Sequence, residues 1–112
     1  MTYRKYNARK VETPDGIFDS RKEHKRWQEL KLLQETGEIR DLKRQESFLL
    51  IPSQKDEKGR TIERPVKYVA DFTYRDLDNK LHVEDSKGMK TTDYILKRKM
   101  MLHLLGIRIE EV

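Results

Sequence analysis

The chain has 112 residues with a net charge of +5, and 40% of them are charged against 35% hydrophobic, which predicts one folded domain with a heavily charged surface. The absence of cysteine excludes disulfides, thiolate zinc sites and a cysteine nucleophile. No signal peptide and no apolar run near the roughly 18 residues of a membrane span are found, so a soluble, cytoplasmic protein is expected.

The charge is unevenly distributed along the chain. Residues 1–10 carry four basic residues and no acid, while residues 86–108 carry six basic residues and one acid. These two segments together hold +9, and the rest of the chain holds −4. Such segregation favours a polyanionic partner, because neutralised phosphates release counterions, although a solvated charged surface would show the same pattern.

The beginning of the chain is predicted to be a basic N-terminal arm over residues 1–16. Pro14-Asp15-Gly16 has the composition of a turn, and partial disorder is expected before Ile17. A single domain is then expected over residues 17–112.

A first helix is predicted from Ser20 to Gly37. Ser20 and Glu23 have the spacing of a capping box, and glycine is the usual residue after a helix end. Its inward face would carry Trp27, Leu30 and Leu33.

The rest of the chain alternates between strand and helix patterns. One or two strands are predicted in residues 39–51, an exposed loop or hairpin tip at 53–64, a strand hairpin at 66–76 and 80–87, a helix from Thr92 to Gly106, and a strand at 107–112. The order α-β-β-β-α-β predicts an α/β fold with a mixed central β-sheet flanked by helices.

Two aspartates and a lysine lie on the neighbouring strands of this predicted hairpin. Asp71 lies opposite an apolar face formed by Val66, Tyr68, Ala70, Phe72 and Tyr74. A charge within such a strand is costly unless it is compensated. Alternate residues share a face, so Asp85 and Lys87 project together on the next strand.

The hairpin loop decides whether Asp71 and Asp85 meet, because a one-residue slip moves a side chain to the other face. A three-residue loop, Leu77-Asp78-Asn79, pairs the two acids and needs a left-handed last residue, which asparagine tolerates. A two-residue loop, Asp78-Asn79, would separate them. We favour the three-residue loop.

The same residues carry a family resemblance. Ala70-Asp71-Phe72 followed by Val83-Glu84-Asp85-Ser86-Lys87-Gly88 resembles the bipartite signature of the PD-(D/E)XK nuclease superfamily, although Ala70 stands where proline is frequent. Phe18-Asp19-Ser20-x-x-Glu23 resembles the first helix of small phage-encoded members and of archaeal Holliday-junction resolvases. This resemblance covers roughly residues 17–112 and implies a restriction-endonuclease-like fold.

The resemblance implies a metal-dependent DNA endonuclease. Asp71 and Asp85 would hold Mg²⁺ or Mn²⁺, with the backbone carbonyl of Ser86 as a further ligand, and the metal would activate water. Lys87 would orient or help deprotonate that water. Glu23 would be a fourth catalytic and metal-binding residue if its helix face packs on the sheet, but a capping-box role explains it equally well.

DNA is the predicted partner, and branched or recombination-intermediate DNA is the favoured substrate. Candidate phosphate contacts are Arg4, Lys5, Arg9, Lys10, Lys90, Thr91, Thr92, Lys97 and Lys99. Paired cuts would require a homodimer or two binding events, and the resemblance suggests a phage-encoded protein acting in a bacterial host. The alternative is a catalytically inactive nucleic-acid-binding module with the same fold. The three histidines share no metal-ligand spacing, and no role is assigned to them.

Overall fold

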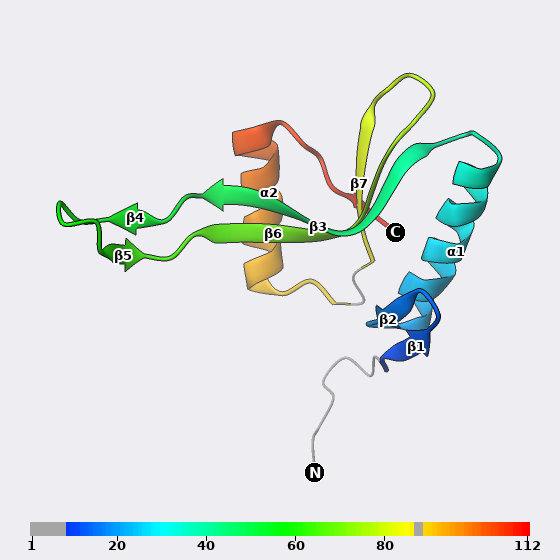
Figure 1. The fold of residues 1–112 in the computed structure, drawn as a ribbon, viewed down its shortest axis with the longest axis horizontal. Coiled ribbons are helices and arrows are strands. Elements are labelled where there is room, and N and C mark those ends of the chain that lie inside the picture. Colours follow the sequence, from blue (N-terminus) through cyan, green and yellow to red (C-terminus); the bar gives the residue numbers. More distant parts are fainter. Residues whose placement is uncertain (1–8, 87–88) are drawn as a thin grey trace, which may run out of the picture.

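The computed structural model describes residues 9–86 and 89–112 (Figure 1). Within these residues, two helices and a four-stranded sheet form the body, to which two short hairpins are added. The elements are β1 (Val11–Thr13), β2 (Gly16–Phe18), α1 (Arg21–Glu35), β3 (Arg40–Ile51), β4 (Gln54–Lys55), β5 (Thr61–Glu63), β6 (Val66–Arg75), β7 (Leu81–Asp85), α2 (Thr92–Leu105) and β8 (Glu110–Glu111).

Part of the predicted N-terminal arm is a hairpin. β1 and β2 pair antiparallel around the predicted turn. Phe18 at the end of β2 is completely buried, and the guanidinium of Arg44 lies 3.7 Å from its ring centroid. Arg44 also donates a hydrogen bond of 2.8 Å to the carbonyl of Ile17. The expected disorder before Ile17 is therefore wrong for residues 11–16, because these contacts fix the hairpin to the body.

The predicted first helix is confirmed. The hydroxyl of Ser20 accepts a hydrogen bond of 3.1 Å from the backbone N–H of Glu23, and the helix ends two residues before Gly37. Leu30 is completely buried, and Trp27 and Leu33 pack against the same apolar cluster. This is the face that the sequence predicted to point inward.

The main sheet has the strand order β3-β6-β7-β8. β3, β6 and β7 pair antiparallel, and β8 runs parallel to β7. The predicted α/β class with a mixed sheet and two helices is therefore confirmed. The β1–β2 hairpin is an addition to the predicted order, and β4 and β5 form a hairpin tip that extends the β3–β6 ribbon away from the body (Figure 1).

The loop between β6 and β7 has the predicted three residues. Phe72 pairs with Glu84, and the backbone N–H of Asp76 donates a 3.1 Å hydrogen bond to the carbonyl of Lys80. Asn79, the last loop residue, has the expected left-handed backbone with φ of 64°. Asparagine pays little for this conformation, so the loop sequence fixes the register of the whole hairpin.

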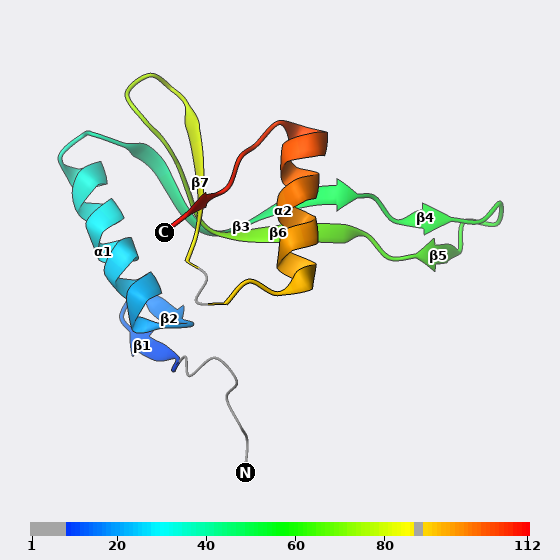
Figure 2. The same cartoon turned by 180° about the vertical axis from the view of Figure 1, so that it is seen from behind.

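β6 serves two apolar clusters along its length. Tyr68 and Ala70 belong to the cluster that includes α2, whereas Phe72 and Tyr74 belong to the cluster that includes α1. These alternate residues therefore serve two clusters in succession along the strand. At the boundary between them, β3 has a left-handed residue, Gln45, with φ of 54°. The β3–β6 ribbon bends along its length, with α2 in front of it and α1 beyond the bend (Figure 2).

The second helix has the predicted ends. The hydroxyl of Thr91 accepts a 3.1 Å hydrogen bond from the backbone N–H of Tyr94, and Gly106 closes the helix with φ of 67°. The predicted last strand shortens to the two residues of β8. Over the described ranges, neither helix is both long and apolar enough to cross a membrane.

Candidate functional site

The β6–β7 register brings the two predicted aspartates to the same place. The pairs from Phe72 with Glu84 onward, continued by one residue, set Asp71 opposite Asp85. Asp71 is 9% exposed and Asp85 is fully buried. One carboxylate oxygen of Asp71 accepts a 2.7 Å hydrogen bond from the backbone N–H of Ser86, so three of the predicted site residues adjoin one another.

Tyr68 holds the Asp85 carboxylate from the α2 side. Its hydroxyl donates a hydrogen bond of 2.5 Å to Oδ2 of Asp85. Burial and this hydrogen bond raise the pKa of Tyr68, so the hydroxyl stays protonated and remains a donor. The sequence predicted Tyr68 only as a core residue, because its hydrogen bond to Asp85 joins two strands and has no local sequence signal.

Glu23 is the predicted site residue that α1 carries. Its side chain is 2% exposed, and Oε2 accepts a 3.0 Å hydrogen bond from the backbone N–H of Asp19. Burial raises the pKa of Glu23, and the charge of Asp85 contributes in the same direction. Glu23 therefore takes part in helix capping and also lies within electrostatic reach of Asp85. Asp71, Asp85 and Glu23 are called the acidic site below.

Gln45 contacts Glu23 of the acidic site, but it was not among the site residues predicted from the sequence. Its amide nitrogen lies 3.5 Å from Oε1 of Glu23. The flanking pairs Arg44 with Phe72 and Glu46 with Ala70 set it opposite Asp71 in the β3–β6 register. A glutamine within a polar strand has no sequence signal that would predict its contact with Glu23 or its left-handed backbone.

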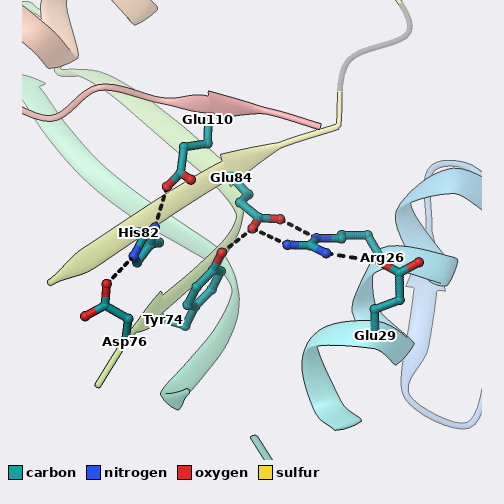
Figure 3. Close-up of polar contacts among 7 residues, drawn as sticks. All are labelled: Arg26, Glu29, Tyr74, Asp76, His82, Glu84 and Glu110. Atoms are coloured by element: carbon teal, nitrogen blue, oxygen red, sulfur yellow. Dashed lines mark hydrogen bonds and ion pairs between the residues drawn. The ribbon is translucent and has the colours of Figure 1, made fainter. Parts of the chain in front are cut away.

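Glu84 anchors α1 to the sheet through Arg26 (Figure 3). It is 1% exposed, and Arg26 binds it through two hydrogen bonds of 2.8 and 2.7 Å. Tyr74 donates a further hydrogen bond to the same carboxylate. The hydrogen bonds that Arg26 donates to Glu84 raise the pKa of Arg26. Glu84 and Asp85 thus face opposite sides of β7, as the strand alternation predicted.

His82 connects the hairpin loop to β8 on the Glu84 side (Figure 3). Its two ring nitrogens lie 2.8 Å from a carboxylate oxygen of Asp76 and 2.7 Å from one of Glu110. The ring also stacks on Tyr74 at a centroid distance of 5.0 Å. Burial lowers the pKa of His82, but the two carboxylates outweigh it, so the pKa is raised.

The predicted phosphate contacts are dispersed. Lys10 lies 3.9 Å from Asp19, Lys90 lies 3.4 Å from Glu111, and Lys97 lies 3.4 Å from Asp93. Thr91 caps α2, Arg9 and Thr92 are exposed, and Lys99 lines an apolar groove with Leu50 and Met100. Arg4 and Lys5 lie outside the described residues.

The predicted catalytic lysine, Lys87, also lies outside the described residues. Over residues 9–86 and 89–112, no three acidic or histidine side chains are arranged to hold a metal ion as they stand. The oxygen donors of Asp71 and Asp85 nevertheless suit a hard cation. Mg²⁺ is commonly bound by one or two carboxylates together with waters and substrate phosphate, so two adjacent aspartates meet that requirement.

The fold and the site together define an α/β domain with buried carboxylates at the end of its central hairpin. The chain belongs to the family described as "Protein of unknown function (DUF1064)", whose model matches residues 3–108. Neither the curated proteins nor the solved structures contain a match to it.

Proposed function

We propose that the protein is a Mg²⁺- or Mn²⁺-dependent DNA endonuclease that hydrolyses phosphodiester bonds at the acidic site. The observation that carries this proposal is the β6–β7 register, which sets Asp71 opposite Asp85 in a buried position. Mg²⁺ is commonly bound by one or two carboxylates, and water and a substrate phosphate would complete its coordination at these two aspartates.

The order of the main elements supports the finer assignment of the fold. Apart from the two hairpins, α1, β3, β6, β7, α2 and β8 follow one another along the chain. This sequence of elements, with Asp71 on β6, Asp85 on β7 and Lys87 two residues later in the sequence, supports a restriction-endonuclease-like domain of the PD-(D/E)XK type.

Each residue of the site has a defined task in this mechanism. Asp71 and Asp85 would hold the cation, which would supply Lewis-acid stabilisation of the charge that develops on the phosphate. The N–H of Ser86 fixes one oxygen of Asp71, and the hydroxyl of Tyr68 fixes one oxygen of Asp85. Lys87 would orient the attacking water, and Glu23 would be a further ligand of the metal.

The test is cleavage of linear, single-stranded and four-way-junction DNA with Mg²⁺ or Mn²⁺ by the parent and by Asp71→Asn. Asp78→Asn is the matched control, because Asp78 is an exposed loop residue of the same hairpin. We expect at least a hundredfold loss of cutting for Asp71→Asn and parental cutting for Asp78→Asn. Junction DNA should be the best substrate if the protein acts on recombination intermediates.

A catalytically inactive nucleic-acid-binding module with the same fold is the second candidate. It is favoured by the lack, among the described residues, of three side chains placed to hold a metal. DNA binding by a folded parent protein that cuts nothing with either cation would establish this candidate. Parental cutting by Asp71→Asn would move the chemistry elsewhere and overturn the proposed site.

A further inference from the structure

A cleft of about 370 Å³ opens between α1 and the end of β7. Its lining consists of Lys22, Lys25, Arg26, Glu29, Ser86 and Val112. Most of these residues come from a single face of α1, and three of them are basic. None of them was selected from the sequence as a nucleic-acid contact.

The charged side chains of the cleft, together with the Glu84 carboxylate bound to Arg26, have a net charge of +1, and two of the three cations are lysines. Arg26 is engaged by the buried Glu84 and by Glu29, whose carboxylate lies 3.0 Å from it. Lys22 and Lys25 are exposed, and neither makes an ion pair within the part of the chain that is described. They are three residues apart on the helix, so their ammonium groups project from the same side. The cleft is therefore suited to an anion.

The cleft adjoins the acidic site through two shared connections. Ser86 lines the cleft, and its backbone N–H donates a hydrogen bond to Asp71. Lys22 precedes Glu23 directly on α1, so consecutive helix residues serve the cleft and the acidic site. A DNA strand whose scissile phosphodiester lies at Asp71 and Asp85 would therefore place a neighbouring phosphate at the cleft.

We propose that this cleft binds the backbone phosphate that neighbours the scissile one, through Lys22 and Lys25. This inference rests on the proposed function, since it names where the substrate strand leaves the acidic site. Lysine ammonium groups are flexible point charges, which suit a contact to phosphate that reads no sequence. The strand would then be positioned by α1 on one side and cut at the end of β7.

The experiment compares the parent with Lys22→Gln/Lys25→Gln and with Lys58→Gln/Lys80→Gln. The second pair removes the same charge from exposed positions in the β4–β5 and β6–β7 turns. Binding of a labelled DNA strand is titrated at several salt concentrations with EDTA present, so that no cation is needed. We expect the cleft variant to bind severalfold more weakly and its log–log salt slope to flatten by roughly 0.7 to 0.9, the value for one phosphate contact.

The outcomes separate this inference from the proposed function. If the parent cuts DNA but the cleft variant keeps the parental affinity, salt slope and cutting rate, the cleft is overturned while the nuclease stands. If nothing cuts but the cleft variant alone loses salt slope, the nuclease fails and the phosphate site stands. If the cleft variant loses binding of inorganic phosphate at matched ionic strength but keeps the parental DNA affinity and salt slope, the cleft is a free-phosphate site and the strand contact is overturned.

Discussion

Replacing Arg26 by methionine should destabilise the protein by about 3 kcal/mol. The substitution keeps the apolar stem but removes the guanidinium that forms two short hydrogen bonds with Glu84. Removing one partner of a buried ion pair costs about 3–5 kcal/mol, since the other charge is left without compensation. The lower end applies, because the Arg26 side chain is 27% exposed and water can replace part of the contact.

Urea unfolding followed by tryptophan fluorescence measures this change. Trp27 is the only tryptophan, and it stacks on Phe72 at a centroid distance of 5.9 Å, so its emission reports on the packing of α1. The control is Glu29→Gln, which removes the exposed partner of the same guanidinium and should cost less than about 1 kcal/mol.

The double variant Arg26→Met/Glu84→Gln isolates the buried charge as the cause. Glutamine can still accept the hydrogen bond from Tyr74 but carries no charge. The double variant should therefore be more stable than Arg26→Met alone, by about 1–2 kcal/mol. Equal stability of the two, or a loss below about 1 kcal/mol for Arg26→Met, would refute the reasoning.

Two further predictions concern titration. Burial and the charge of Asp85 raise the pKa of Glu23, so its ionisation disfavours the folded state as the pH rises above 4.5. Glu23→Gln should stabilise the metal-free protein at neutral pH and weaken Mg²⁺ binding. Urea unfolding measures the stability and calorimetry the Mg²⁺ affinity, and no change in either would contradict the prediction. The pKa of His82 is raised above 6.5 by Asp76 and Glu110 against the effect of burial, so its contribution is complete below pH 6.5 and is lost as the pH rises through the folded pKa. His82→Gln should remove this decline from the pH profile of stability, and an unchanged profile would contradict the assignment.

The parts of the fold that could be predicted are those encoded by local chemistry. Ser20 and Gly37 mark the ends of α1 because a hydroxyl cap and a left-handed glycine act over a few residues. Asn79 sets the β6–β7 register in the same way, since it permits the left-handed end of a three-residue loop. From that single register followed the meeting of Asp71 and Asp85, which was the central expectation for the site.

The parts that could not be predicted depend on contacts between distant segments. Arg26 and Glu84 are separated by 58 positions, and each alone looks like an ordinary surface charge. The apolar residues of β6 are divided between two clusters near the left-handed Gln45, and a polar residue in a polar strand does not predict this division. The β1–β2 hairpin was missed because its stability comes from burying Phe18 beneath Arg44, not from its own sequence pattern.

The two acids that end β7 have complementary tasks. Glu84 anchors α1 through Arg26, and Arg26 lies three residues after Glu23, so the anchor also fixes the position of Glu23 relative to Asp85. That position is electrostatically unfavourable, because burial raises the pKa of Glu23 and the charges of Asp19 and Asp85 add to the increase. If the acidic site binds the proposed cation, the added positive charge would favour the ionised form of Glu23 and stabilise the folded protein.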